Sequence, residues 1–179
     1  MRLARRNLPL AMLAGAVTLG GVALGLRHPG TRPALVGRQV PQFQLPCLPG
    51  TGGLRALLNS QELRGRDWVM TAWASWCAPC REEHPVLMQV ARSSGLPWLG
   101  LVHRDDPRAA DEWLLRLGNP YEVNLLDTDG RVGEAFGLIG VPETFVVDRT
   151  GIVRLRHTGP MTRSLWREQL QPRLRDLTG

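Results

Sequence analysis

The sequence contains no lysine, so all 22 of its basic residues are arginine. It also has no run of five like charges and no alternation of basic with aromatic residues, so nothing in it indicates a nucleic-acid groove. Four arginines, at positions 2, 5, 6 and 27, flank an apolar amino-terminal segment. Without those four, the basic residues only slightly outnumber the 16 acidic ones, so the net charge reflects that segment and a solvated surface.

Cysteine is also scarce, and the three in the chain are Cys47, Cys77 and Cys80. Three cysteines cannot form a four-cysteine zinc site, and His84, although close to the pair, completes no credible ligand set. We therefore expect neither a metal nor another cofactor. Cys47 lies on or beside an expected first strand, where we interpret it as a small buried apolar residue.

Cys77 and Cys80 are separated by two residues, between an apolar run at 68–74 typical of a buried strand and an expected helix at 81–93. This order of strand, CxxC and helix is the thioredoxin arrangement, and it predicts a reversible disulfide. At a helix start, unpaired backbone N–H groups and the helix dipole favour a thiolate over a thiol. We therefore expect Cys77 to attack a substrate disulfide and the more shielded Cys80 to resolve the mixed disulfide.

Residues 8–26 are a run of 19 residues without a charge, which is long enough to span a hydrocarbon core. We interpret residues 1–27 as a signal anchor whose preceding arginines stay in the cytoplasm. The alternative is a cleaved signal peptide, because small residues near the end of the run could admit a peptidase. Residues 28–36 contain two prolines and indicate a linker, which leaves residues 37–179 as one globular domain in the periplasm.

The remaining pattern alternates strands with helices. Strands are expected at 40–48, 67–73, 97–103, 122–126, 144–147 and 152–157, and helical segments at 60–64, 109–117, 132–136 and 164–177. Asp106 is the expected N-cap of the second helical segment, and Pro172 should kink the last one. Pro41 and Pro46 confine the first strand to an edge. A turn at 148–151 makes the last two strands an antiparallel hairpin. The prediction is an α/β fold whose central mixed sheet has helices on both faces.

The segment Gly140-Val141-Pro142-Glu143-Thr144-Phe145 resembles the loop in which thioredoxin-fold proteins place a cis-proline opposite their cysteines. The resemblance implies a cis bond between Val141 and Pro142. A proline has no N–H, so the backbone at Val141 would be left to pair with an extended substrate beside Cys77.

Residues 37–158 as a whole resemble the membrane-anchored thiol:disulfide interchange proteins of cytochrome c maturation, the DsbE/CcmG type of the thioredoxin superfamily. The stretches that carry the resemblance are 76–85, 117–121 and 137–148 with 151–157, and the last is the most specific. The resemblance implies a dithiol reductant in the periplasm, attached to the bacterial inner membrane. It would take electrons from a transmembrane thiol carrier of the DsbD/CcdA kind. It would pass them to oxidised apocytochrome c, or to the thiol chaperone of apocytochrome c, before haem attachment.

The same resemblance points to Glu83 and Glu143 as acidic residues that tune the cysteines. Thioredoxins carry a buried aspartate six residues before the first cysteine, and here Thr71 occupies that position. Proton transfer to Cys80 must therefore come from another group, for which Glu83 is our first candidate. A nearby carboxylate raises the pKa of a thiol, so Cys77 should be only moderately acidic.

Aromatic and apolar residues near the pair complete the expected site. We expect Trp76 to be partly exposed and to contact substrate together with Val141, whereas Trp73 should lie in the core. Ile139 departs from relatives that carry a tyrosine near the site, which removes any phenolic hydrogen bond there. The histidines at 84, 103 and 157 have no partner visible in the sequence, and we interpret them as structural or surface residues.

Two other functions remain open at this point. One is a broader periplasmic reductase of the TlpA or ResA kind, which would serve copper-site assembly or another maturation path. The other is a thioredoxin-fold copper chaperone that binds the metal through Cys77, Cys80 and a histidine as soft ligands.

Overall fold

A computed structural model describes residues 35–50 and 55–178 of the chain. The signal anchor expected at residues 1–27 lies outside these ranges, as does most of the linker expected at 28–36. Within the described ranges, no helix combines the length and the apolar character that a membrane crossing requires. Near the start of the described residues, the N–H of Gly37 donates to the carbonyl of Val153 at 2.7 Å, which ties this segment to the central domain.

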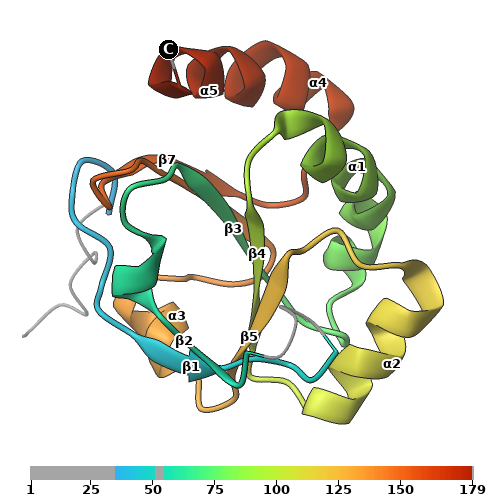
Figure 1. Ribbon diagram of the computed structural model, residues 1–179. Coiled ribbons are helices and arrows are strands. Elements are labelled where there is room, and N and C mark those ends of the chain that lie inside the picture. The colour runs from blue at the N-terminus through green and yellow to red at the C-terminus, as the bar shows by residue number, and fades with distance from the viewer. Residues whose placement is uncertain (1–34, 51–54, 179) are drawn as a thin grey trace, which may run out of the picture. The chain divides into compact units, whose positions relative to one another are not determined.

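The centre of the domain is a five-stranded sheet in the order β5-β4-β3-β6-β7 (Figure 1). Its strands are β3 (Trp68–Trp73), β4 (Trp98–His103), β5 (Val123–Asp127), β6 (Glu143–Val147) and β7 (Val153–Thr158). The strands β3, β4 and β5 pair in parallel, β6 pairs antiparallel with β3, and β7 pairs antiparallel with β6. The predicted mixed sheet and its closing hairpin are confirmed.

Long helices cover one face of this sheet. They are α1 (Ala78–Ser94) and α2 (Pro107–Leu117), and α2 begins as predicted with Asp106 as its N-cap. Successive residues of a strand point to opposite faces, so Val69 and Trp73 of β3 enter the core beneath these helices. There Trp73 packs against Trp113 of α2, with ring centroids 4.7 Å apart.

The carboxyl-terminal segment packs on the same face, through Trp166 and Leu170. The sequence predicted one helix kinked at Pro172, whereas the structure has α4 (Arg163–Leu165), a π-helical turn η2 (Trp166–Leu170) and α5 (Gln171–Thr178). Proline cannot donate to the helical ladder, and its ring crowds the carbonyl four residues earlier. The carbonyl four residues before Pro172 belongs to Glu168, inside the wider π turn η2, which is where the helix accommodates the proline.

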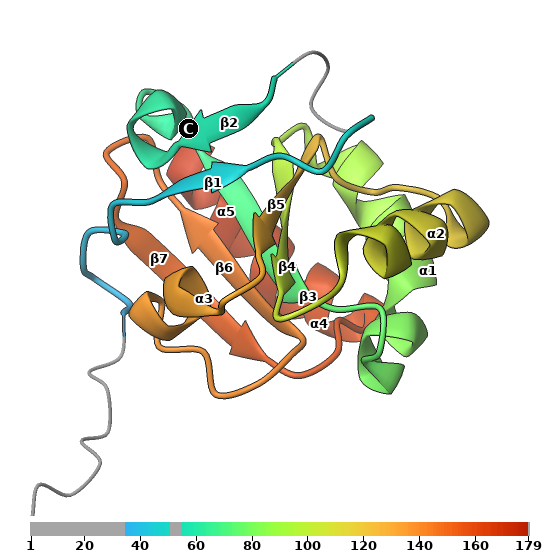
Figure 2. The ribbon, with the colours of Figure 1, turned by 90° about the horizontal axis from the view of Figure 1, so that it is seen from below.

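The opposite face carries α3 (Arg131–Ala135), the 3-10 turn η1 (Ser60–Leu63) and a small second sheet (Figure 2). That sheet pairs β1 (Gln44–Pro46) with β2 (Leu57–Asn59) in antiparallel. The strand predicted at 40–48 is therefore shorter than expected, and its partner β2 was not predicted. Prolines at both ends of the stretch limit how far it can pair, because neither ring nitrogen carries a hydrogen.

The sheet topology brings three chain segments together at one end of the domain. The carboxyl ends of the parallel strands β3, β4 and β5 share this end. The amino end of the antiparallel strand β6 joins them, because Ala72 of β3 is in register with Glu143 of β6. The CxxC that follows β3 and the proline that precedes β6 therefore have to be neighbours.

Candidate active site

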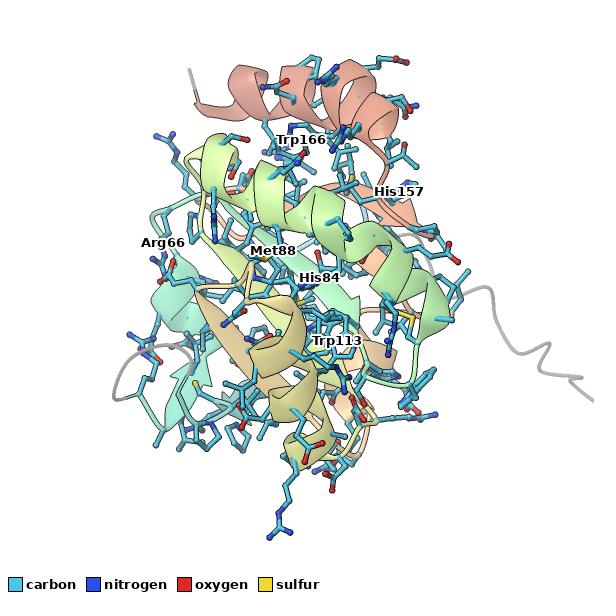
Figure 3. All side chains as sticks on the ribbon, turned by 90° about the vertical axis from the view of Figure 1, so that its right-hand side faces the viewer. Arg66, His84, Met88, Trp113, His157 and Trp166 are labelled. Atoms are coloured by element: carbon cyan, nitrogen blue, oxygen red, sulfur yellow. A yellow bond between two sulfur atoms is a disulfide. The ribbon has the colours of Figure 1, made fainter. Side chains whose placement is uncertain are left out.

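The amino terminus of α1 holds the two cysteines, as predicted. Cys77 is the N-cap residue, and its Sγ accepts a hydrogen bond from the backbone N–H of Cys80 at 3.1 Å. Pro79 lies in the first turn, where a missing N–H costs no helical hydrogen bond. Cys77 and Cys80 form a disulfide with an Sγ–Sγ distance of 2.11 Å, visible as a yellow bond at the start of α1 in Figure 3. Cys77 is 4% exposed and Cys80 1%, so the resolving cysteine is the more shielded of the two.

The peptide bond between Val141 and Pro142 is cis, which confirms the expectation from the resemblance. The Sγ atom of Cys77 lies 3.5 Å from the carbonyl oxygen of Val141. After reduction, a Cys77 thiol at this position is within reach to donate to that carbonyl. The loop before β6 thus borders the sulfur that we expect to attack the substrate.

Glu143 holds the loop that carries the cis-proline. Its carboxylate is fully buried, and Oε1 accepts a hydrogen bond from the N–H of Ile139 at 3.0 Å. Oε2 pairs with the guanidinium of Arg156 at 2.7 Å, and the same guanidinium donates to the carbonyl of Gly137 at 2.8 Å. Glu143 and Arg156 therefore fix both ends of the segment 137–139, and the negative charge of Glu143 is compensated by the guanidinium of Arg156. The expected effect of Glu143 on the cysteines stays a prediction.

Glu83 lies on the inner face of α1, one helical turn after Cys80, and is only 1% exposed. Its Oε2 accepts a hydrogen bond from the N–H of Met161 at 2.6 Å, while Oε1 has no partner among the described residues. Burial raises the pKa of Glu83 from 4.5 to about 7, and the Met161 N–H opposes this only in part. A carboxyl group with a pKa near neutrality can both take and return a proton in the pH range where thiols react.

Thr71 is buried at the position where thioredoxins carry their aspartate. Its hydroxyl lies 3.2 Å from the hydroxyl of Thr144, on the neighbouring strand β6. Each hydroxyl satisfies the other, and neither group titrates near neutral pH. Glu83 therefore remains as a buried carboxyl group on the cysteine-bearing helix with a pKa near neutrality.

His84 ties α1 to the end of α2. Its Nε2 lies 3.2 Å from the carbonyl oxygen of Leu117 and 3.1 Å from that of Gly118. The ring makes an edge contact with Trp113 at 4.3 Å between centroids, and Figure 3 shows these two side chains facing each other between the helices. Burial lowers the pKa of His84, and the two carbonyls oppose that change. The interpretation of this histidine as a structural residue is confirmed.

Two large apolar side chains are exposed beside the disulfide. Trp76 is 61% exposed and Ile139 80% exposed, whereas Trp73 is fully buried, as expected for each tryptophan. The indole N–H of Trp76 donates to the carbonyl oxygen of Arg104 at 3.2 Å, which fixes the direction of the ring. Together these side chains form an exposed apolar surface near Cys77, and the expected contact of Trp76 with substrate stays a prediction.

Comparisons with known proteins agree with this geometry. The redoxin family model matches residues 35–170. The thiol:disulfide interchange protein DsbE of Escherichia coli K12 is 39% identical over 140 residues, which cover 78% of this chain and 74% of that protein. DsbE of Tatumella citrea is 41% identical over 142 residues, covering 78% of this chain and 74% of that protein. The chain belongs to the DsbE family.

The fold of this DsbE-family chain also has solved counterparts. A secreted Mycobacterium tuberculosis disulfide oxidoreductase, described as homologous to DsbE of Escherichia coli, matches with a TM-score of 0.62 and 25% identity. The match covers 76% of this chain and 96% of the other. With its disulfide at a helix start opposite a cis-proline, the chain is a thiol:disulfide oxidoreductase with a thioredoxin-like fold.

The DsbE-type site also includes residues that the sequence did not reveal. Asp105 accepts hydrogen bonds from both the backbone N–H and the hydroxyl of Ser75, two residues before Cys77. His103, interpreted as structural or surface, pairs its Nδ1 with a carboxylate oxygen of Asp127 at 2.8 Å. His103 is the last residue of β4 and Asp105 follows two residues later. Polar residues at the carboxyl end of a parallel strand were the signal that could have pointed to them.

Proposed function

We propose that this chain is a periplasmic, membrane-anchored dithiol reductant of cytochrome c maturation that works through Cys77 and Cys80. The observation that carries the proposal is the buried carboxyl group of Glu83, with a pKa of about 7, one helical turn after Cys80 in the CxxC pair of a DsbE-family chain. A carboxylate near a thiolate disfavours that thiolate by like-charge repulsion. Oxidising members of the thioredoxin superfamily stabilise their reduced, thiolate form. A carboxylate that disfavours the thiolate destabilises the reduced form instead, which makes the protein a better reductant.

The reaction is a pair of thiol–disulfide exchanges. In the reduced protein, the Cys77 thiolate attacks one sulfur of the substrate disulfide, which breaks the substrate S–S bond and releases the other substrate sulfur as a thiolate. That thiolate takes a proton from water. Cys80 then gives its proton to Glu83 and attacks the Sγ of Cys77, which breaks the mixed disulfide and frees the second substrate sulfur as a thiolate. This thiolate also takes a proton from water, and Glu83 returns its proton to the solvent. Two electrons have moved from the protein to the substrate, which ends as two thiols, and the protein ends as the disulfide form.

The proposed substrate is oxidised apocytochrome c, or the thiol chaperone that presents it. Because each turnover leaves Cys77 and Cys80 oxidised, a dithiol donor has to reduce them again, and we assign this role to a transmembrane carrier of the DsbD/CcdA kind. The charge-free run of 19 residues near the amino terminus supports an inner-membrane anchor with the domain in the periplasm. Mass spectrometry of the membrane fraction tests the anchor, since a mature chain beginning near residue 26 would contradict it.

A genetic experiment tests the function. In a strain that depends on this chain, Cys77→Ser and Cys80→Ser should abolish the assembly of c-type cytochromes, measured by haem staining, while general disulfide formation continues. Cys47→Ala is the matched control, because it removes the remaining cysteine without touching the pair. Normal cytochrome maturation with Cys77→Ser would refute the proposal.

A biochemical comparison separates this function from that of a broader reductase. Reduced protein should reduce an oxidised CxxCH apocytochrome peptide faster than the disulfide of a copper chaperone. The reverse order of rates would point to copper-site assembly instead.

A further inference from the structure

A pocket of about 350 Å³ opens directly beside the disulfide. Two of its walls, Trp76 and Val141, flank Cys77: the first precedes it in the chain, and the carbonyl of the second lies 3.5 Å from its Sγ. Ile139, 80% exposed, adds a third apolar wall. On a bound substrate, the residue next to the cysteine that Cys77 attacks is therefore within reach of this pocket, since neighbouring Cα atoms are about 3.8 Å apart.

His103 lines the same pocket, together with Arg104 and Glu134, whose charged groups pair with each other. Its Nδ1 lies 2.8 Å from Asp127, whose carboxylate also accepts hydrogen bonds from the N–H groups of Val132 and Gly133, at 2.9 Å each. A carboxylate with those partners is an acceptor, so in the neutral form of His103 the ring proton lies on Nδ1 and Nε2 is an acceptor. Within the described residues, Nε2 has no hydrogen-bond partner.

The ring of His103 is held in place by packing. A Cβ atom added at Gly133 would lie 2.5 Å from Nδ1, so the close approach of the ring to α3 requires glycine at that position. The side chain of His103 is only 12% exposed, whereas that of Asp127 is fully buried. The acceptor atom therefore has a fixed direction before any substrate arrives.

Arg104, the residue after His103, holds the ring of Trp76, which forms another wall of the pocket. It has a φ of +50°, a left-handed conformation that is unfavourable for a residue with a side chain. In this conformation its carbonyl accepts a hydrogen bond from the indole N–H of Trp76, while its guanidinium pairs with Glu134. The Arg104 side chain lies so close to Gly130 that a Cβ atom there would collide with it. Backbone strain of this kind persists where the surroundings enforce it, and here it sets the position of an exposed aromatic wall.

We infer that this pocket, with His103 as its hydrogen-bond acceptor, binds the histidine that directly follows the second cysteine of a haem-attachment motif, C-x-x-C-H. The inference rests on the proposed function and names the feature of apocytochrome c that the site recognises. The imidazole of the substrate stacks on Trp76 and donates its N–H to Nε2 of His103. With the histidine in the pocket, the cysteine before it lies next to Cys77, so Cys77 attacks the second cysteine of the motif.

Matched peptides test the specificity. Two oxidised peptides, identical except that His or Phe follows the second cysteine, are reduced by the full-length reduced protein, and kcat/KM is measured for each. The His peptide should be preferred about three- to tenfold, the effect of one neutral hydrogen bond. His103→Asn keeps a donor for Asp127 but lacks an acceptor that reaches the pocket, so the ratio should fall to about one. Leu115→Ala, on the exposed side of α2, is the control and should keep the full ratio.

A trapping experiment tests the same inference without changing the pocket. Cys80→Ser prevents resolution, so Cys77 stays joined to the peptide sulfur that it attacked, and mass spectrometry of fragments identifies that sulfur. The mixed disulfide should form on the cysteine next to histidine. Equal rates for the two peptides in the wild type, or a mixed disulfide mainly on the first cysteine, would overturn the pocket assignment alone. Failure to reduce either peptide would overturn the proposed function as well.

Discussion

Glu83 is the residue whose replacement tests the site most directly. Glu83→Gln preserves the size of the side chain and an oxygen that can accept from the N–H of Met161. It removes the charge that burial disfavours and the proton acceptor that we assign to Cys80. The variant should therefore be more stable at high pH and slower in the step that Cys80 performs.

The size of the stability effect follows from the pKa. A rise from 4.5 to about 7 on folding corresponds to about 3 kcal/mol. Below pH 4.5 the group is protonated in both the folded and the unfolded state, and it costs nothing. Between pH 4.5 and about 7 the unfolded chain loses the proton while the folded protein keeps it, so stability falls as the pH rises. Above that range the full penalty applies, and Glu83→Gln should unfold with about 3 kcal/mol more free energy than the wild type at pH 8.5.

Urea unfolding of the oxidised proteins at pH 4, 5.5, 7 and 8.5 measures this difference. Other titrating groups, including His84 with its lowered pKa, are common to both proteins and cancel in the comparison. Glu82→Gln is the matched control: it removes the same charge from the exposed neighbouring position, so its effect should stay small at every pH. Stopped-flow reduction of a peptide disulfide should show release of the mixed disulfide slowed by about a hundredfold in Glu83→Gln. A stability difference that does not change with pH would refute the assignment of a raised pKa.

Three further outcomes test the rest of the site. Arg156→Met leaves the buried Glu143 carboxylate without its cation and should cost about 3–5 kcal/mol in urea unfolding, whereas Glu143→Gln combined with Arg156→Met should cost much less. If both variants lose the same stability, the ion pair does not hold the loop. Thr71→Val leaves the Thr144 hydroxyl unpaired and should cost about 1–3 kcal/mol, most of which the double valine variant should regain. Cys47 is buried, and burial raises the pKa of its thiol, so iodoacetamide should label the native oxidised protein only after urea is added; labelling without urea would contradict its burial.

The local elements of this fold were predictable because short sequence signals determine them. Asp106 followed by a proline starts α2, and the turn after β6 makes a hairpin regardless of the rest of the chain. The strand β2 escaped prediction because its three residues carry no alternation, and only pairing with β1 makes them a strand. Pairing between distant segments depends on tertiary structure and leaves no mark in a short window.

The candidate site divides in the same way. The spacing of Cys77 and Cys80 was enough to predict a redox-active pair, and Pro142 was identified through a resemblance that covers a whole loop. His103 and Asp127 are 24 residues apart, and they meet only because the parallel register of β4 and β5 places them opposite each other. The burial of Glu83, which decides its pKa, depends on the chain at Met161, 78 residues away. No local pattern contains that information.

The two attachments of α1 bear on how this helix is held. Glu83 binds the chain after β7 on one side of the helix, and its neighbour His84 binds the end of α2 on the other. These contacts tie the helix that carries both cysteines to two other segments of the domain, and neither contact involves the sulfur atoms. The hold on the helix is therefore separate from the bond that is made and broken at its first turn.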